Sequence, residues 1–267
     1  MTEIDLFRTR NFVPDFERYR TEYASRSLAT RATLRSQINV AYGDAPTERL
    51  DLFFPETQSG PAPVHIFIHG GYWRMFAKED YSFIADPVTA AGGIAAIIDY
   101  SLMPAVRMVT IIDQIRRATT WIADNADDFG GDATRLTMSG HSAGAHLCCF
   151  LLNPQSAPIK AALLVSGVYD LKPLQTSFLQ AEIGLTDTEV ARYSPLHLGL
   201  TTTTHTAILV GEAETAPFHA QAAALAQRLN AGPVTTLPGA NHMSIVLELG
   251  TPDTLASEAL TRLIREN

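Results

Sequence analysis

Short runs of apolar and β-branched residues alternate along most of the chain with longer segments whose apolar positions recur every three or four residues. Such short runs predict buried strands, here at 64–69, 93–99, 135–139, 160–166, 206–210 and 234–237. The longer segments predict helices at 109–127, 143–152, 217–230 and 254–266. This alternation is typical of an α/β fold with a mainly parallel sheet and helices on both faces.

The first 54 residues add elements outside this rhythm. Strands predicted at 36–42 and 49–54 are separated by the turn Gly43-Asp44-Ala45-Pro46, which favours an antiparallel pair at the sheet edge and brings the sheet to eight strands. A helix predicted at 15–30 either covers a cleft or packs on the core. With 267 residues, of which 46% are hydrophobic, we expect one α/β domain over 1–267, with residues 1–35 as a helical extension.

The pentapeptide Gly140-His141-Ser142-Ala143-Gly144 joins a predicted strand to a predicted helix. In a nucleophile elbow, a serine at such a junction sits in a strained turn with its hydroxyl exposed to a cleft, and small neighbours let strand and helix approach. The pattern alone is short enough to arise by chance as an ordinary turn that caps a helix. In this context it makes Ser142 the candidate nucleophile.

A second glycine-containing segment, His69-Gly70-Gly71-Tyr72-Trp73, follows the predicted strand at 64–69. Backbone N–H groups in such a loop can stabilise the negative charge that develops on a carbonyl oxygen during attack. The candidate donors are the N–H groups of Gly71 or Tyr72, with Gly70 as a further option, together with that of Ala143. The simpler alternative is a glycine-rich turn whose aromatic residues pack on the core.

His242 lies in a loop after the last predicted strand and is the candidate base, because a serine hydroxyl needs a group that takes its proton near neutral pH. The base needs an acid to orient it. Glu214 follows the predicted strand at 206–210 and gives the order serine, acid, histidine that is expected of an α/β-hydrolase. Glu212 and Asp170 remain alternatives.

Several aromatic side chains from these segments either line a cleft for an aryl substrate or belong to the core. They are Tyr72, Trp73, Phe76, Tyr100, His141 and Phe218.

Together, HGGYW, GHSAG, the segment Gly-Glu-x-Glu-x-x-x-Phe and the late Asn-His resemble the arylformamidase (kynurenine formamidase-like) branch of the α/β-hydrolases. The stretch Phe129-Gly130-Gly131-Asp132 is similar to the neighbouring hormone-sensitive-lipase-like esterases. The resemblance spans about residues 35 to 250. It implies a serine hydrolase without metal or other cofactor that acts on formamides of aromatic amines or on small esters, with Ser142, His242 and Glu214 as its triad. Family members commonly have aspartate in place of Glu214.

Composition narrows the partners further. A net charge of −8 argues against nucleic acid, and no run approaches the roughly 20 apolar residues that span a bilayer. The start Met1-Thr2-Glu3-Ile4-Asp5 has no basic, apolar leader, and the adjacent Cys148 and Cys149 cannot form a structural disulfide; both favour a cytoplasmic protein. The oligomeric state, a homodimer among the options, stays open.

Three functions are therefore considered for a small acyl substrate, expected to be aromatic. The leading one is an arylformamidase-like amidase, and the second is a carboxylesterase for small-acyl esters. The third is a ligand-binding protein that has kept a hydrolase fold without catalysis. A metal hydrolase is disfavoured because no H-E-x-x-H motif is present.

Overall fold

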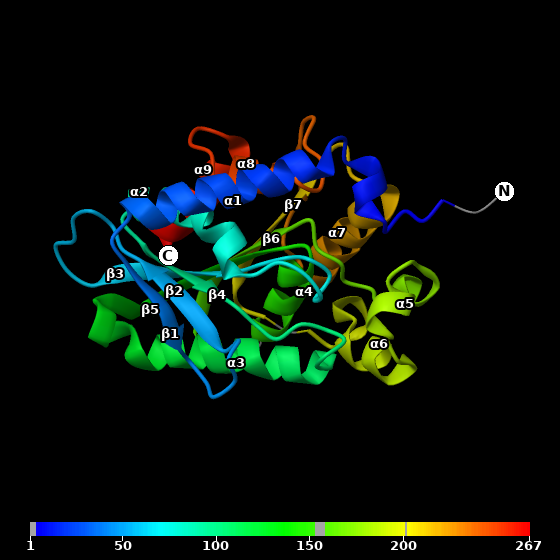
Figure 1. The fold of residues 1–267 in the computed structure, drawn as a ribbon, viewed down its shortest axis with the longest axis horizontal. Helices are drawn as coiled ribbons and strands as arrows, with labels where there is room; N and C mark the ends of the chain where they lie inside the picture. The colour runs from blue at the N-terminus through cyan, green and yellow to red at the C-terminus, as the bar shows by residue number, and fades with distance from the viewer. Residues whose placement is uncertain (1–3, 153–157, 201) are drawn as a thin grey trace.

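A computed structural model describes residues 4–152, 158–200 and 202–267. Residues 1–3, on which the expectation about the N-terminal sequence partly rests, lie outside the described residues. Its described strands form one eight-stranded sheet in the order β1-β2-β4-β3-β5-β6-β7-β8 (Figure 1). The strands are β1 (Ser36–Ala41), β2 (Arg49–Phe53), β3 (Ala62–Ile68), β4 (Ile94–Ile98), β5 (Gly131–His141), β6 (Ile159–Val165), β7 (His205–Gly211) and β8 (Thr235–Leu237).

The sheet has the predicted architecture. β1 pairs with β2, and β2 with β4, in antiparallel fashion, whereas the pairs from β4 to β8 are parallel. Only β5 differs clearly from its predicted range, since it begins at Gly131 rather than at residue 135. Gly131 and Asp132 pair with Ala62 and Pro63 ahead of an irregularity in the ladder, so backbone pairing extends the strand beyond its apolar residues.

Helices cover both faces of the sheet (Figure 1). Those on one face are α3 (Met108–Asn125), α4 (Ala143–Cys148), α5 (Gln180–Ile183), α6 (Asp187–Tyr193) and α7 (Ala216–Leu229). Those on the other are α1 (Phe16–Thr33), α2 (Ala85–Ala90), α8 (Ser244–Leu249) and α9 (Leu255–Glu266). Alternate residues of one strand serve the two faces: Ile66 and Ile68 of β3 face the first cluster, and Phe67 the second.

The predicted helices at 15–30, 109–127, 217–230 and 254–266 correspond to α1, α3, α7 and α9. The segment 143–152 is instead divided into α4 and a short 3₁₀ helix, Cys149–Leu151. The sequence patterns did not predict α2, α5, α6 and α8, because helices of four to seven residues are too short to show a clear apolar period.

Helix α1 is attached to the rest of the molecule through buried charges. Arg31, near its end, contacts the carboxylate of Asp51 in β2, whose side chain is 0% exposed. Lys78, in the 3₁₀ helix η2 (Lys78–Ile84), also reaches Asp51, at 3.1 Å. Charges removed from water need such partners, so this cluster defines where α1 lies over η2 and β2.

Among the described residues, no helix combines the length and the apolar character that a bilayer crossing requires.

Candidate active site

Ser142 lies between the end of β5 and the start of α4, in a backbone conformation with φ 55° and ψ −116°. A side chain in the left-handed region is strained and persists where the surroundings require it. Helix α4 and the end of β3 meet so closely that a Cβ on Gly144 would lie 2.0 Å from the carbonyl oxygen of Ile68. Only glycine is compatible with that approach, which brings the start of α4 against the end of β3.

His242 lies between β8 and α8, with Nε2 3.1 Å from Oγ of Ser142. Its loop is held by Asn241, whose Oδ1 accepts the N–H groups of Met243 and Ser244, each at 2.9 Å. The neighbouring ring of His141 donates through Nε2 to the carbonyl oxygen of His242 at 2.9 Å. These contacts orient the imidazole toward the serine.

Glu214 completes the arrangement, since its Oε2 accepts from Nδ1 of His242 at 2.6 Å and its side chain is 0% exposed. Neither alternative acid lies in this position. Glu212 is exposed and accepts the N–H of Gly239 at 2.8 Å. Asp170 accepts the N–H of Lys172 at 2.9 Å and faces His197. The structure therefore brings Ser142, His242 and Glu214 together, and not the two rivals.

The electrostatics suit a carboxylate that stays ionised. Burial by itself raises the pKa of Glu214, but the His242 imidazole and the hydrogen bonds from His242, Ser166 and the Gly211 N–H outweigh it, so that the pKa is lowered. For His141, burial and the nearby His242 hold the pKa well below its ordinary value. His141 is therefore neutral and places no positive charge beside His242.

The loop after β3 lies directly beside the serine. A Cβ on Gly70 would be 3.2 Å from Cβ of Ser142, and Gly71, Tyr72 and Trp73 all have positive φ, at 105°, 51° and 59°. The side chain of His69 donates through Nδ1 to the Gly70 carbonyl at 2.8 Å and contacts Asp99 through Nε2. On the other side, Ala143 is the first residue of α4, so its N–H has no acceptor within the helix.

The six aromatic residues predicted to bind substrate fall into two groups, one beside His242 and one around the loop at 69–76. His141 and Phe218 contact the His242 ring, with centroids 4.8 and 4.6 Å apart. Trp73 packs edge-on against His146, and Tyr100 stacks on His69 at 4.2 Å.

Tyr72 donates its hydroxyl to the carbonyl of Phe7, and Phe76 packs against Tyr81 with ring centroids 5.7 Å apart. The structure thus groups these four around the loop at 69–76. A contact between any of the six aromatics and a substrate stays a prediction.

Two residues that support this site, Ser166 and Tyr23, were not singled out from the sequence. Ser166 contacts Glu214, Tyr23 of α1 donates to Met243, and the N-terminal segment is held by Tyr72 and by Thr215, which donates to the Leu6 carbonyl at 2.8 Å. The local signal for Ser166 is the Ser-Gly pair at 166–167, at the end of the strand predicted at 160–166. Ser142 is 1% and His242 6% exposed.

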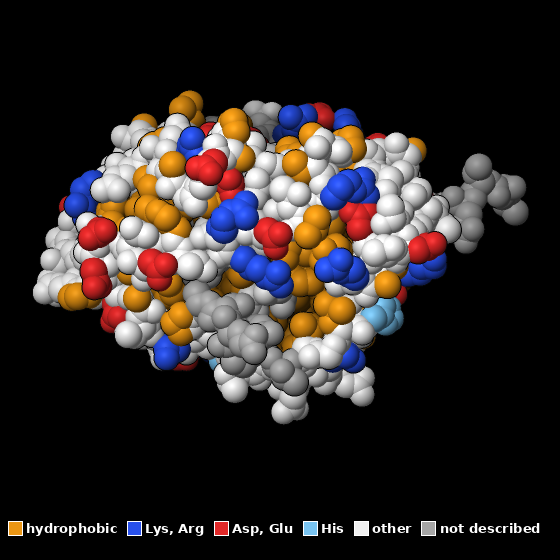
Figure 2. All heavy atoms as spheres, turned by 90° about the horizontal axis from the view of Figure 1, so that it is seen from below, with side chains coloured by type: hydrophobic (Ala, Val, Ile, Leu, Met, Phe, Trp, Pro, Cys, Tyr) orange, Lys and Arg blue, Asp and Glu red, His pale blue; other side chains and the backbone are white. Residues whose placement is uncertain are grey.

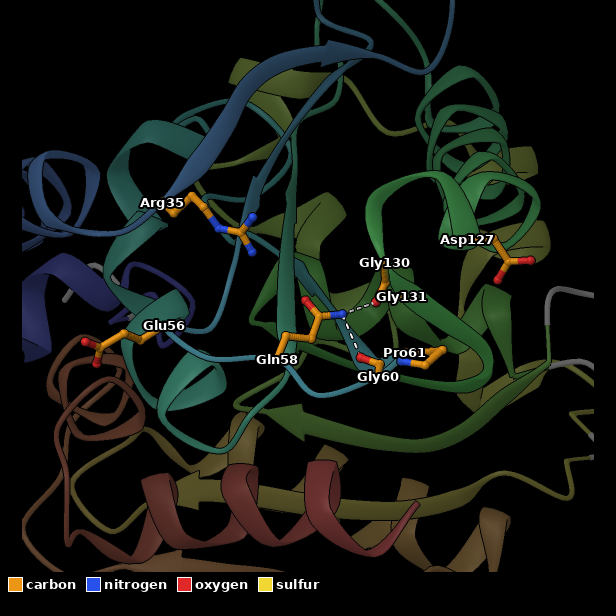
Figure 3. A pocket seen from close by; sticks show the side chains of 8 residues that line it. All are labelled: Arg35, Glu56, Gln58, Gly60, Pro61, Asp127, Gly130 and Gly131. Atoms are coloured by element: carbon orange, nitrogen blue, oxygen red, sulfur yellow. Dashed lines mark hydrogen bonds between the residues drawn. The ribbon is translucent and has the colours of Figure 1, made fainter.

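Several surface hollows among the described residues lie away from the triad. One, of about 980 Å3, lies where β5 begins, beside Gln58, Gly130 and Gly131, at the opposite end of that strand from Ser142 (Figure 3). Figure 2 looks at the α3 side, where hydrophobic side chains gather in a hollow among charged ones. On this side Val109 and Ile112 of α3 line a groove with Tyr193 of α6.

Within the described ranges, no group of three or more His, Cys, Asp or Glu residues is placed to hold a metal ion.

Comparison with known proteins finds similar sequences among formamidases and esterases. Residues 50–164 match the model of the BD-FAE family. A kynurenine formamidase of Danio rerio is 33% identical over 171 residues, which are 62% of this chain and 57% of that protein. An isoprenylcysteine α-carbonyl methylesterase of Arabidopsis thaliana is 31% identical over 153 residues, which are 52% of this chain and 36% of that protein. The chain thus matches less than two thirds of the length of either relative.

Among solved structures, a proposed thioesterase from Silicibacter sp. TM1040 aligns with a TM-score of 0.85 at 26% identity and covers 99% of both chains. The alignment includes the whole sheet and both helical layers. An α/β-hydrolase fold is therefore shared over the full described chain.

Proposed function

Because this chain is an α/β-hydrolase related to esterases and formamidases, we propose that it cleaves a small acyl group from an aryl amide or ester through an acyl-enzyme, as an arylformamidase-like serine hydrolase. The observation that carries the proposal is the hydrogen-bonded series Ser142–His242–Glu214, with distances of 3.1 and 2.6 Å. The relationship to a kynurenine formamidase supports the formamide as the substrate class.

In the proposed mechanism, each of the three side chains has a role in one or more steps of the reaction. The Nδ1 proton of His242 is held by Glu214, which leaves Nε2 free to accept the proton of Ser142 as Oγ attacks the acyl carbon. The imidazolium then gives this proton to the leaving amine or alcohol. Water attacks the acyl-enzyme with the same base, and Ser142 is regenerated.

Negative charge on the former carbonyl oxygen would be stabilised by the N–H of Ala143 and by N–H groups of the loop at 70–72. One such donor is worth about 3 kcal/mol of transition-state stabilisation in other hydrolases. Gly71 and Tyr72 of this loop both have positive φ. The loop is held by hydrogen bonds from the N–H groups of Arg74 and Met75 to the Gly71 carbonyl. A loop held in this way supplies donors that need no reorganisation during the reaction.

The close packing around the serine favours a small acyl group. Ser142 is 1% exposed, and the backbone of Gly70 lies against it. A formyl or acetyl group needs little room at the acyl carbon, whereas a long chain needs a channel. The aromatic rings of Phe218 and His141 beside His242 suit an aryl leaving group.

A second candidate is a carboxylesterase for small-acyl esters. The methylesterase relative favours it, and it uses the same three side chains. The two candidates differ only in the bond cleaved, so kinetics decides between them. The purified protein would be assayed with N-formylkynurenine, formanilides, p-nitrophenyl acetate and lactones, alongside Ser142→Ala.

Formamide turnover that Ser142→Ala abolishes supports the first candidate. Fast ester cleavage with negligible formamide turnover would replace it by the second. A fluorophosphonate probe that leaves Ser142 unlabelled, in a protein inactive on the whole panel, would favour a non-catalytic binding protein instead. Ser27→Ala, a buried serine of α1, is the control for the effect of substitution alone.

A further inference from the structure

Two serines occupy equivalent places at the carboxyl ends of neighbouring parallel strands. Ser142 follows β5 with φ 55°, and Ser166 follows β6 with φ 53°. The N–H of Ser142 donates to the carbonyl of Val165, and that of Ser166 donates to the carbonyl of Leu209, both at 2.8 Å. Each serine therefore ends one strand, pairs with the next, and adopts a left-handed conformation at the same edge of the sheet.

The hydroxyl of Ser166 does not face solvent, since this residue is only 1% exposed. It donates to Oε1 of Glu214, and the same oxygen accepts the N–H of Gly211 at 3.0 Å. The other oxygen, Oε2, accepts from His242. Both carboxylate oxygens are thus engaged, and the series of side chains extends from Ser142 through His242 and Glu214 to Ser166.

We propose that Ser166 is a positioning residue of the active site, whose hydroxyl holds Oε1 of Glu214 so that Oε2 remains on His242. This inference rests on the function proposed above. A glutamate has one more rotatable bond than the aspartate that is common at triad positions, and it loses more conformational freedom when it is ordered. An anchor on its second oxygen offsets this difference.

The backbone supports the same conclusion. A left-handed conformation is costly for a residue with a Cβ, and it persists where the surrounding structure requires it. Ser166 is held in this strained conformation, and its hydroxyl is thereby placed against Glu214. The charge on the carboxylate makes this a stronger hydrogen bond than one between neutral groups.

The first test compares Ser166→Ala with Ser166→Gly. Both remove the hydroxyl, but only glycine relieves the strain. We expect both to lower kcat by about 10- to 100-fold on whichever panel substrate the wild type cleaves, with KM nearly unchanged. If Ser166→Gly kept the wild-type kcat and only Ser166→Ala lost it, backbone conformation would be the cause and the proposal would be overturned.

A double-mutant cycle separates a positioning role from a structural one. If Ser166 acts through Glu214, Ser166→Ala lowers kcat further by less than about twofold once Glu214→Ala is already present. Full additivity of the two losses in kcat would show that Ser166 acts independently of Glu214, contrary to the proposal. Ser27→Ala serves again as the buried-serine control.

Proton NMR supplies a readout that needs no substrate. The Nδ1 proton of His242, shared with Glu214, should give a far-downfield resonance in the wild type and in Ser27→Ala. We expect it to shift or broaden in Ser166→Ala and Ser166→Gly; an unchanged resonance would contradict the proposal. A wild type without Ser142-dependent hydrolysis would instead refute the proposed function, while this resonance would still report on Ser166.

Discussion

The hydroxyl of Tyr23 donates to the carbonyl oxygen of Met243 at 2.6 Å, across 220 residues of sequence, and Tyr23 is 0% exposed. Met243 is the residue after His242. On the other side of the histidine, Nδ2 of Asn241 donates to the hydroxyl of Tyr19 at 3.1 Å. Helix α1, which runs along one side of the molecule in Figure 1, thus holds the loop that carries the candidate base.

Tyr23→Phe removes this hydroxyl and leaves the Met243 carbonyl buried without its donor. We expect a loss of about 1–3 kcal/mol in the free energy of unfolding. We also expect a several-fold lower kcat, because the His242 loop becomes less well ordered. Urea unfolding and steady-state kinetics measure the two effects.

The matched control for Tyr23→Phe is Thr119→Val. Thr119 also buries a hydroxyl that donates to a backbone carbonyl, that of Ile115 at 2.8 Å, but it lies within α3. It should lose stability and keep kcat. Equal kcat values for Tyr23→Phe and the wild type would show that α1 does not order the base.

Ser142→Ala and His242→Ala each remove a group that the mechanism needs in both half-reactions. We expect kcat to fall by about 10⁶-fold, as for nucleophile and base substitutions in serine proteases. Active-site titration with a fluorophosphonate should label the wild type and leave Ser142→Ala unlabelled. Residual hydrolysis by Ser142→Ala at more than a thousandth of the wild-type rate would point to another nucleophile.

Glu214→Gln keeps the shape of the side chain but removes the charge that stabilises the imidazolium. We expect kcat to fall by about 10³- to 10⁴-fold, less than for the serine or the histidine. Glu212→Gln is the control, because that residue is exposed and bonded to the Gly239 N–H. A silent Glu214→Gln together with an inactive Glu212→Gln would reverse the assignment of the acid.

Buried neutral histidines make stability depend on pH. Burial lowers the pKa of His65 to about 3 and that of His146 to about 4, whereas both titrate near 6.5 when unfolded. Between these values the unfolded chain binds more protons than the folded one, so the free energy of unfolding falls as pH decreases from 6.5 toward 4. Each such histidine contributes a slope of about 1.4 kcal/mol per pH unit.

Urea unfolding at several pH values tests whether the free energy of unfolding falls with pH and how much His65 contributes. In His65→Gln the slope of this free energy against pH should be smaller, by the equivalent of about one bound proton, between pH 6 and pH 4. His205→Gln, at an exposed position, should leave the slope as in the wild type. An identical slope in His65→Gln would mean that His65 is not neutral in the folded protein.

Asp51 is the common partner of Arg31 and Lys78 beneath α1. Asp51→Asn leaves the buried ammonium of Lys78 without its central counter-charge, so we expect the free energy of unfolding to fall by about 3–5 kcal/mol. Asp113→Asn removes an exposed partner of Arg116 and should cause no measurable change. Equal stability of the two variants in urea would show that the buried cluster does not anchor α1.

The amino-acid sequence was sufficient for the sheet and for the longer helices. Buried parallel strands carry apolar runs, and α3 and α9 have a clear helical period, so local composition determines these elements. The sequence also pointed to Ser142, because the glycine spacing around it is that of a strand-to-helix turn. It pointed to Glu214 and His242 through the order serine, acid, histidine along the chain. The short helices α2, α5, α6 and α8 were missed because they contain too few residues to show a clear apolar period.

Only the tertiary structure chose between Glu214, Glu212 and Asp170, since all three carboxylates follow strands and only one reaches the imidazole. It also revealed Ser166 and Tyr23, whose contacts join residues 48 and 220 positions apart. Such contacts leave no periodic trace in the sequence, because they depend on how strands and helices are placed in space. Motif and period specify the elements, whereas packing decides which side chains meet.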